Sequence, residues 1–244
     1  MSGWGSRIAD VARGRSPATR MPLPEPLWLE WLTLAGLLAF ASWVLGVRGV
    51  WALLLQSDPT GITAVIVVIF VGASLWAGQR SRELQRQRDG LAAALRSAPS
   101  AESWAGEYLH MLATKPAAEA LALDLLSERT HGPHSAAWWV NGIQLKLGLL
   151  GKVIGFSILA LNIGQIQNFD PAQSQELLKS LTAGLGIALL TTMVGLVGNI
   201  LLGLQLTRLD RFADTLVADC QRAGLRLMPA SASASTETAT GDPR

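Results

Sequence analysis

Three polar residues stand inside long apolar stretches of this sequence, and they are its first candidates for chemistry. Lys152 lies within LGLLGKVIGFSILALN, and the pair Thr191 and Thr192 lies within GLGIALLTTMVGLVGNILLGL. Inserting a lysine at the centre of a bilayer costs about 2.5–3.5 kcal/mol, so polar groups at that depth usually have a function. Lys152 therefore needs a carboxylate or a wet cavity.

No carboxylate of this chain is expected at the depth of Lys152. Glu30 is expected near the inner surface, and Asp58 and Asp170 near the outer one. The missing countercharge favours a carboxylate from another chain, or a lysine pKa that desolvation lowers. The alternative is a lysine whose stem reaches the inner headgroups.

Small residues surround these polar positions at helical spacing. In lipid, small residues let helices approach closely, because packing and interhelical hydrogen bonds replace the hydrophobic drive. The stripes predict tight packing of two helices, and packing alone would explain them. Each threonine hydroxyl could bond to a carbonyl one turn earlier, and the asparagine could bridge the helices. The residues are Gly148, Gly151, Gly155, Ala188, Gly195 and Asn199.

The composition is typical of a membrane protein. Hydrophobic residues make up 50% of the chain and charged residues only 16%, and nine Trp stand against one Tyr, which suits anchoring at headgroup level. The single Cys220 excludes an internal disulfide and a thiolate cluster. His131 and His134 are a weak metal pattern, and no P-loop, H-E-x-x-H or G-x-S-x-G occurs. We expect no enzyme, cofactor or metal.

Four apolar stretches are long enough to cross a bilayer, which takes about 20 helical residues. We therefore predict an all-α integral membrane protein with four transmembrane helices in two hairpins, 27–79 and 138–221. The expected spans are 29–54, 61–79, 142–165 and 181–206.

The remaining segments are polar. Residues 80–137 balance seven acidic against seven basic residues, and we expect long helices that extend from the spans into a helical cytoplasmic collar there. The pair Gly132-Pro133 predicts the end of a helix in this segment. The tails 1–26 and 222–244 are predicted to be disordered, the second being of low complexity from Met228.

The distribution of basic residues predicts the orientation. Lys and Arg are concentrated in 1–26, in 80–137 and after 207, whereas the two turns 56–60 and 166–178 contain none. Because Lys and Arg favour the cytoplasmic side, both termini and the collar are expected in the cytoplasm.

Two stretches carry a resemblance to the MotA/TolQ/ExbB proton-channel family. LGLLGKVIGF, at 147–156, resembles that family's L-G-L-L-G-T-V-x-G-hydrophobic pattern. ALLTTMVGL, at 188–196, is similar to its A-L-x-x-T-x-x-G-L pattern, with Thr192 at the threonine position. The resemblance covers about 135–215, and the two spans before the collar are like the four-span MotA arrangement.

The resemblance implies an energy-transducing, stator-like subunit of the bacterial inner membrane. Such subunits form homopentamers around an ExbD/TolR/MotB-like partner, whose single transmembrane helix bears an essential Asp. Protons or sodium ions pass this Asp and drive mechanical work. Thr192, Thr191 and the small residues around them would then line the ion pathway or contact the partner.

Two positions depart from the family pattern. Lys152 replaces the usual threonine of the third helix, and Ile187 stands where the TolQ/ExbB branch has an acidic residue. Lys152 could pair with the partner's carboxylate and gate the pathway, or mark a chain that no longer conducts. The alternative functions are a non-conducting membrane scaffold that recruits a partner and, less favoured, an anion-selective pore.

Overall fold

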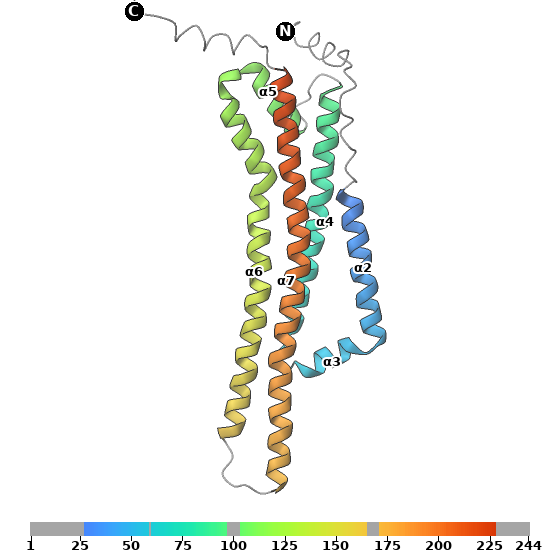
Figure 1. The fold of residues 1–244 in the computed structure, drawn as a ribbon, viewed down its shortest axis with the longest axis vertical. Helices are drawn as coiled ribbons and strands as arrows, with labels where there is room; N and C mark the ends of the chain where they lie inside the picture. The colour runs from blue at the N-terminus through green and yellow to red at the C-terminus, as the bar shows by residue number, and fades with distance from the viewer. Residues whose placement is uncertain (1–26, 59, 97–102, 165–170, 228–244) are drawn as a thin grey trace, which may run out of the picture. The chain divides into compact units, whose positions relative to one another are not determined.

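The computed structural model describes residues 27–58, 60–96, 103–164 and 171–227, and these are almost entirely helical with no strand among them. The predicted all-α class is thus confirmed. The predicted tail 1–26, residues 228–244 of the predicted tail 222–244, and residues 166–170 of the predicted turn 166–178 lie outside the described residues. The elements are α2 (Leu27–Val47), α3 (Val50–Ser57), α4 (Ile62–Ala94), α5 (Trp104–Thr114), a 3-10 turn (Pro116–Ala118), α6 (Glu119–Gly164) and α7 (Pro171–Leu227) (Figure 1).

Four of these helices are long and apolar enough to cross a membrane. They are Leu27–Val47, Ile62–Ala94, Glu119–Leu161 and Leu181–Arg226. Each overlaps one of the four stretches that the sequence predicts to span. The helices indicate a multi-pass membrane protein.

The predicted first span, 29–54, is interrupted. Helix α2 ends at Val47, and Gly49 adopts a left-handed conformation with φ 73° before α3 begins. Glycine is the usual residue at such a helix end, because it has no Cβ to clash in that conformation. The Trp51 indole N–H then donates to the Ser42 carbonyl at 3.0 Å and holds α3 against α2.

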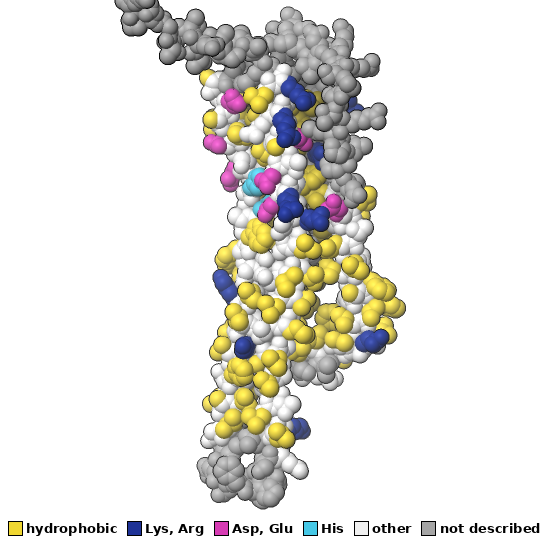
Figure 2. Space-filling view, in the orientation of Figure 1, with side chains coloured by type: hydrophobic (Ala, Val, Ile, Leu, Met, Phe, Trp, Pro, Cys, Tyr) yellow, Lys and Arg dark blue, Asp and Glu magenta, His cyan; other side chains and the backbone are white. Residues whose placement is uncertain are grey.

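The described residues divide into two compact units, and α4, α6 and α7 contribute to both. We call Leu29–Gln79 with His134–Arg208 the apolar unit. We call the described parts of the other unit, chiefly Arg80–Pro133 and 209–227, the polar unit. Hydrophobic side chains cover most of the apolar unit on the face shown in Figure 2.

Helix α7 continues beyond the predicted start of the C-terminal tail at 222. It reaches Leu227 because α5 packs against this last stretch. A Cβ placed on Gly224 would lie 2.6 Å from Leu112 Cδ1 and 3.3 Å from the Tyr108 hydroxyl, so the two helices are in direct contact. The polar unit therefore has a packed core of its own.

Helix α6 passes through Pro133, where the sequence predicts a helix end. In a regular helix the N–H of residue 133 would bond to the Arg129 carbonyl, but proline has no N–H to donate. The Arg80 guanidinium takes that place: Nη2 donates to the carbonyls of Arg129 at 2.5 Å and Thr130 at 3.1 Å. It also lies 5.1 Å from the centre of the Trp104 ring. Arg80 thus supplies the donor that Pro133 lacks.

Replacing Arg80 by alanine should destabilise the polar unit by about 0.5–1.5 kcal/mol, because the hydrogen bonds to the Arg129 and Thr130 carbonyls are lost. Arg80→Lys should destabilise it less than Arg80→Ala, since an ammonium also carries N–H donors. The measurement is thermal unfolding in detergent, followed by helical circular dichroism. The matched control is Arg86→Ala, an exposed residue on the same helix. Equal melting temperatures for Arg80→Ala and Arg86→Ala would contradict the assignment.

Helices α6 and α7 lie side by side in the apolar unit and meet along one continuous stripe (Figure 1). The buried positions on each helix follow one another in alternating steps of three and four residues. That 3.5-residue period is the pattern of a left-handed coiled coil. We call these residues the α6–α7 seam: His134, Ala137, Asn141, Gln144, Gly148, Gly151 and Gly155 of α6, with Gly184, Ala188, Thr191, Gly195, Gly198, Leu202 and Gln205 of α7.

Helix α2 is attached to the apolar unit mainly through its first turn. The Trp31 indole N–H donates to the Ser74 carbonyl at 3.2 Å, and its ring covers Gly78, where a Cβ would be only 2.4 Å away. Glu30 forms an ion pair with Arg208 at 3.2 Å. The rest of α2 is largely exposed, as expected for a helix that faces lipid.

Candidate functional site

Two glycines of the seam bring the α6 and α7 backbones into contact at the level of the predicted site. A Cβ on Gly151 would lie 2.6 Å from Thr191 Oγ1, and one on Gly155 would lie 2.9 Å from the Ala188 nitrogen. Neither position has room for a larger residue without a shift of the opposite helix. The predicted tight packing of the two stripes is therefore present.

The two threonines occupy different surroundings. Thr191 is fully buried, and its hydroxyl donates to the Ile187 carbonyl of its own helix at 2.9 Å. The Thr192 hydroxyl is half-buried, lying 2.8 Å from the Ala188 carbonyl and 3.3 Å from the Gly148 carbonyl of the other helix. The Thr191 hydroxyl bonds to a carbonyl one turn earlier in its own helix, which is the packing role that the sequence left open. The Thr192 hydroxyl also contacts α6.

Asn199 bridges the same two helices. Its Nδ2 donates to the Asn141 carbonyl at 2.9 Å, which is the bridging role that the sequence left open. An interhelical hydrogen bond of this kind contributes about 0.6 kcal/mol on average in a membrane protein. Asn199 thus belongs to the packing of the seam.

Lys152 differs from the other predicted site residues in being exposed. It follows Gly151 directly on α6 and lies at the edge of the seam. Its Nζ lies 6.0 Å from the centre of the Phe156 ring, and Val153 beside it is 61% exposed. Among the described residues, no carboxylate forms an ion pair with it. Lys152 therefore carries its charge on an apolar outer face.

The seam also contains polar residues that our sequence reading did not single out. Gln144 is completely buried, and neither its Oε1 nor its Nε2 has a partner among the described residues. Ser74 and Gln205 pair across α4 and α7, with Gln205 Nε2 2.7 Å from the serine hydroxyl. The sequence does contain a pattern that could have identified these residues. The alternating three- and four-residue spacing of the seam continues toward the N-terminus from Gly148 through Gln144 and Asn141.

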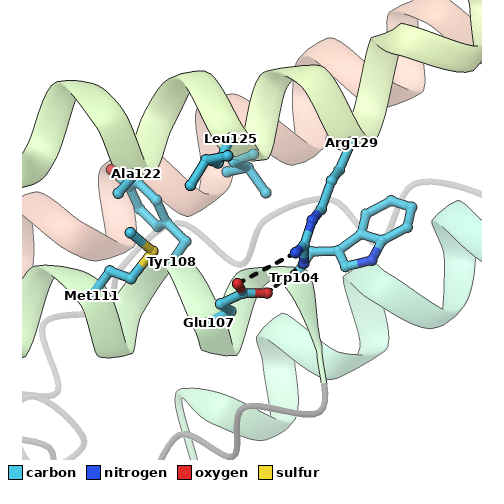
Figure 3. A pocket seen from close by; sticks show the side chains of 8 residues that line it. Trp104, Glu107, Tyr108, Met111, Ala122, Leu125 and Arg129 are labelled. Carbon is cyan, nitrogen blue, oxygen red and sulfur yellow. Dashed lines mark hydrogen bonds and ion pairs between the residues drawn. The ribbon is translucent and has the colours of Figure 1, made fainter.

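The pocket that the structure describes in the polar unit is small. Figure 3 shows the pocket between α5 and α6, where Arg129 and Glu107 form an ion pair beside Trp104 and Tyr108. Its volume of about 10 Å³ is roughly that needed for one water molecule. Burial raises the pKa of the Tyr108 hydroxyl, with smaller contributions from Glu119 and Cys220.

Two titratable side chains of the polar unit stand out, Cys220 and His131. Burial, with Asp219 as the second cause, raises the pKa of the Cys220 thiol to about 12, so it is a poor nucleophile at neutral pH. His131 Nε2 lies 2.9 Å from Asp214 Oδ1. In the part of the chain that the structure describes, no three His, Cys, Asp or Glu residues gather to hold a metal ion.

Comparison of the chain with protein-family models, with curated proteins and with solved structures finds no match. The resemblance of the two seam stretches therefore rests on their own residues.

Enlarging a seam glycine should force the helices apart. In Gly195→Ala, the new Cβ would lie 2.8 Å from the Gln144 carbonyl oxygen and 3.0 Å from Gly148 Cα. Backbone atoms cannot rotate away, so we expect a loss of about 1–3 kcal/mol of stability, measured by thermal unfolding in detergent.

The matched control for this variant is Gly142→Ala on α6, where a Cβ meets no atom within 4 Å. Since alanine favours a helix over glycine, this control should be neutral or slightly stabilised. If Gly195→Ala also left the melting temperature unchanged, the close approach of the helices would be refuted.

Proposed function

We propose that this protein is an ion-channel-type subunit of the bacterial inner membrane that couples proton or sodium motive force to mechanical work. The observation that carries the proposal is the meeting of LGLLGKVIGF, on α6, with ALLTTMVGL, on α7, in one seam. Stretches that share a channel-family pattern and also pack on each other form one structural unit. The four apolar helices supply the membrane anchor that such a subunit requires.

The proposed assembly is a homopentamer around an ExbD/TolR/MotB-like partner with one transmembrane helix. The faces of α6 and α7 that neither the seam nor α4 covers are largely apolar and exposed, which suits contact with lipid, with neighbouring subunits and with such a partner. Both termini and the helical collar at 80–137 lie in the cytoplasm in this proposal. Exposed members of these faces include Leu149, Val153, Leu189, Met193 and Ile200.

Thr192 is the residue we assign to the ion pathway, with Lys152 as the group that tunes it. Thr192 retains accessible surface, and a hydroxyl can supply an oxygen lone pair to a passing ion or water. Lys152 would pair with the partner's membrane carboxylate, since a cation on an apolar surface needs a countercharge. Gly148, Gly151, Gly155, Ala188, Gly195 and buried Thr191 hold the two helices in register.

A non-conducting membrane scaffold is the second candidate. Two observations favour it: both threonine hydroxyls already donate to carbonyls, and Lys152 would repel cations unless it is paired. The scaffold would use the same seam and the same outer face to recruit its partner. The two functions differ in whether ions flow.

Removing the Thr192 hydroxyl should abolish motive-force-dependent ion flux without loss of the oligomer. The measurement is flux into liposomes that contain the protein and its partner, with size-exclusion chromatography for assembly. Thr191→Val is the matched control, because its hydroxyl bonds only within α7 and should leave flux nearly unchanged. Full flux in Thr192→Val removes the pathway role, and no flux in any preparation favours the scaffold.

Replacing Lys152 by threonine should raise basal cation flux several-fold, because it removes the charge that opposes cations on the apolar face. Lys146→Thr, the exposed lysine expected at the inner headgroups, is the control for a general loss of positive charge. The same flux assay applies, and reversal potentials give the ion selectivity. A fall in chloride permeability on Lys152→Thr would instead support an anion pore.

A further inference from the structure

An open groove lies between α3 and the first turns of α7, within the apolar unit. Its volume is about 730 Å³, which is in the range of sites for small molecules, about 300–1,000 Å³. Gln56 of α3 forms one side, and residues between Gln175 and Ile187 of α7 form the other. None of the predicted site residues lines it.

The lining changes from polar to apolar along α7. Gln175, Lys179 and Thr182 come first, with the exposed Leu178 among them, and from Ala183 onward the lining is apolar. Gly186 and Ile187 follow Ala183 toward the seam. At 1.5 Å per residue this change takes place over about 18 Å. The groove therefore offers a positive charge and hydrogen-bond donors at one end and an apolar surface at the other.

Gly186 leaves the apolar end open. A Cβ on this residue would meet no atom within 4 Å, so the space above it is free for a ligand. Among the residues that line the groove, Lys179 is the charged one, and it lies in the half away from Gly186. An elongated ligand with one anionic end fits this arrangement.

We propose that this groove binds an anionic phospholipid. Its phosphate lies at Lys179 and Gln175, where the ammonium supplies charge and the amide supplies N–H donors. The first part of an acyl chain lies over Gly186 and Ile187. The order of these residues matches the order of groups in a lipid, which passes from headgroup to hydrocarbon. The proposal rests on insertion of the four apolar helices in a membrane, but not on ion conduction.

The test is native mass spectrometry of the detergent-purified protein, titrated with phosphatidylglycerol or phosphatidylcholine of the same acyl chains. We expect phosphatidylglycerol to bind more tightly, and Lys179→Gln to reduce that preference about fivefold, the effect of one lysine near a membrane surface. Lys146→Gln, a loss of charge elsewhere on the surface, should leave it unchanged. Glycerol phosphate should not compete, since it has no acyl chain.

A second variant tests the position without altering charge. Gly186→Leu fills the apolar end and should weaken binding of both lipids, whereas Gly72→Leu, also in open space on α4, should not. Equal binding of the two lipids by the native protein, or unchanged binding in Gly186→Leu, would overturn the site. Competition by glycerol phosphate would identify a site for a soluble phosphate instead.

A separate measurement tests membrane insertion, on which both proposals depend. Failure of the protein to remain with membranes after carbonate extraction would overturn insertion, whereas an absence of ion flux would leave the lipid-site proposal unaffected.

Discussion

The contact between the α6 and α7 backbones is the constraint on which the rest of the apolar unit depends. At Gly151 and Gly155 the helices are so close that one added methyl group would overlap the opposite chain. Between helices in lipid there is little hydrophobic drive, so short-range packing and hydrogen bonds must hold them together. Small side chains permit both, and the Thr192 hydroxyl can then reach the Gly148 carbonyl.

The close approach of the two helices also affects which polar residues are buried and which are exposed. Gly151 lies in the contact between the helices, and Lys152, about 100° further round α6, lies at the edge of that contact and is exposed. The amides of Asn141 and Gln144 are buried on the inward face of α6. A charge on the outer face and hydroxyls on the inner one are compatible with a subunit whose countercharge comes from another chain.

A different interaction maintains the continuity of α6. Pro133 removes one backbone donor, and Arg80 replaces it from a neighbouring helix. Because the two N–H groups of Arg80 Nη2 donate to two carbonyls, the helix passes a position that would otherwise end it. The polar unit thus depends on one cation, and its single thiol, Cys220, is buried and weakly acidic.

The sequence by itself determined the helical class, the four apolar helices and the close packing of the two small-residue stripes. Composition and periodicity are local properties, so they can be read without knowing which helices meet. The tertiary structure decided the features that depend on which helices meet, because a local sequence pattern does not specify those contacts. It showed that α2 ends before Gly49, that Arg80 supports α6 at Pro133, that Lys152 is exposed, and that Gln144 is buried. Each of these outcomes depends on a partner distant in sequence, or on which side of a helix is already occupied.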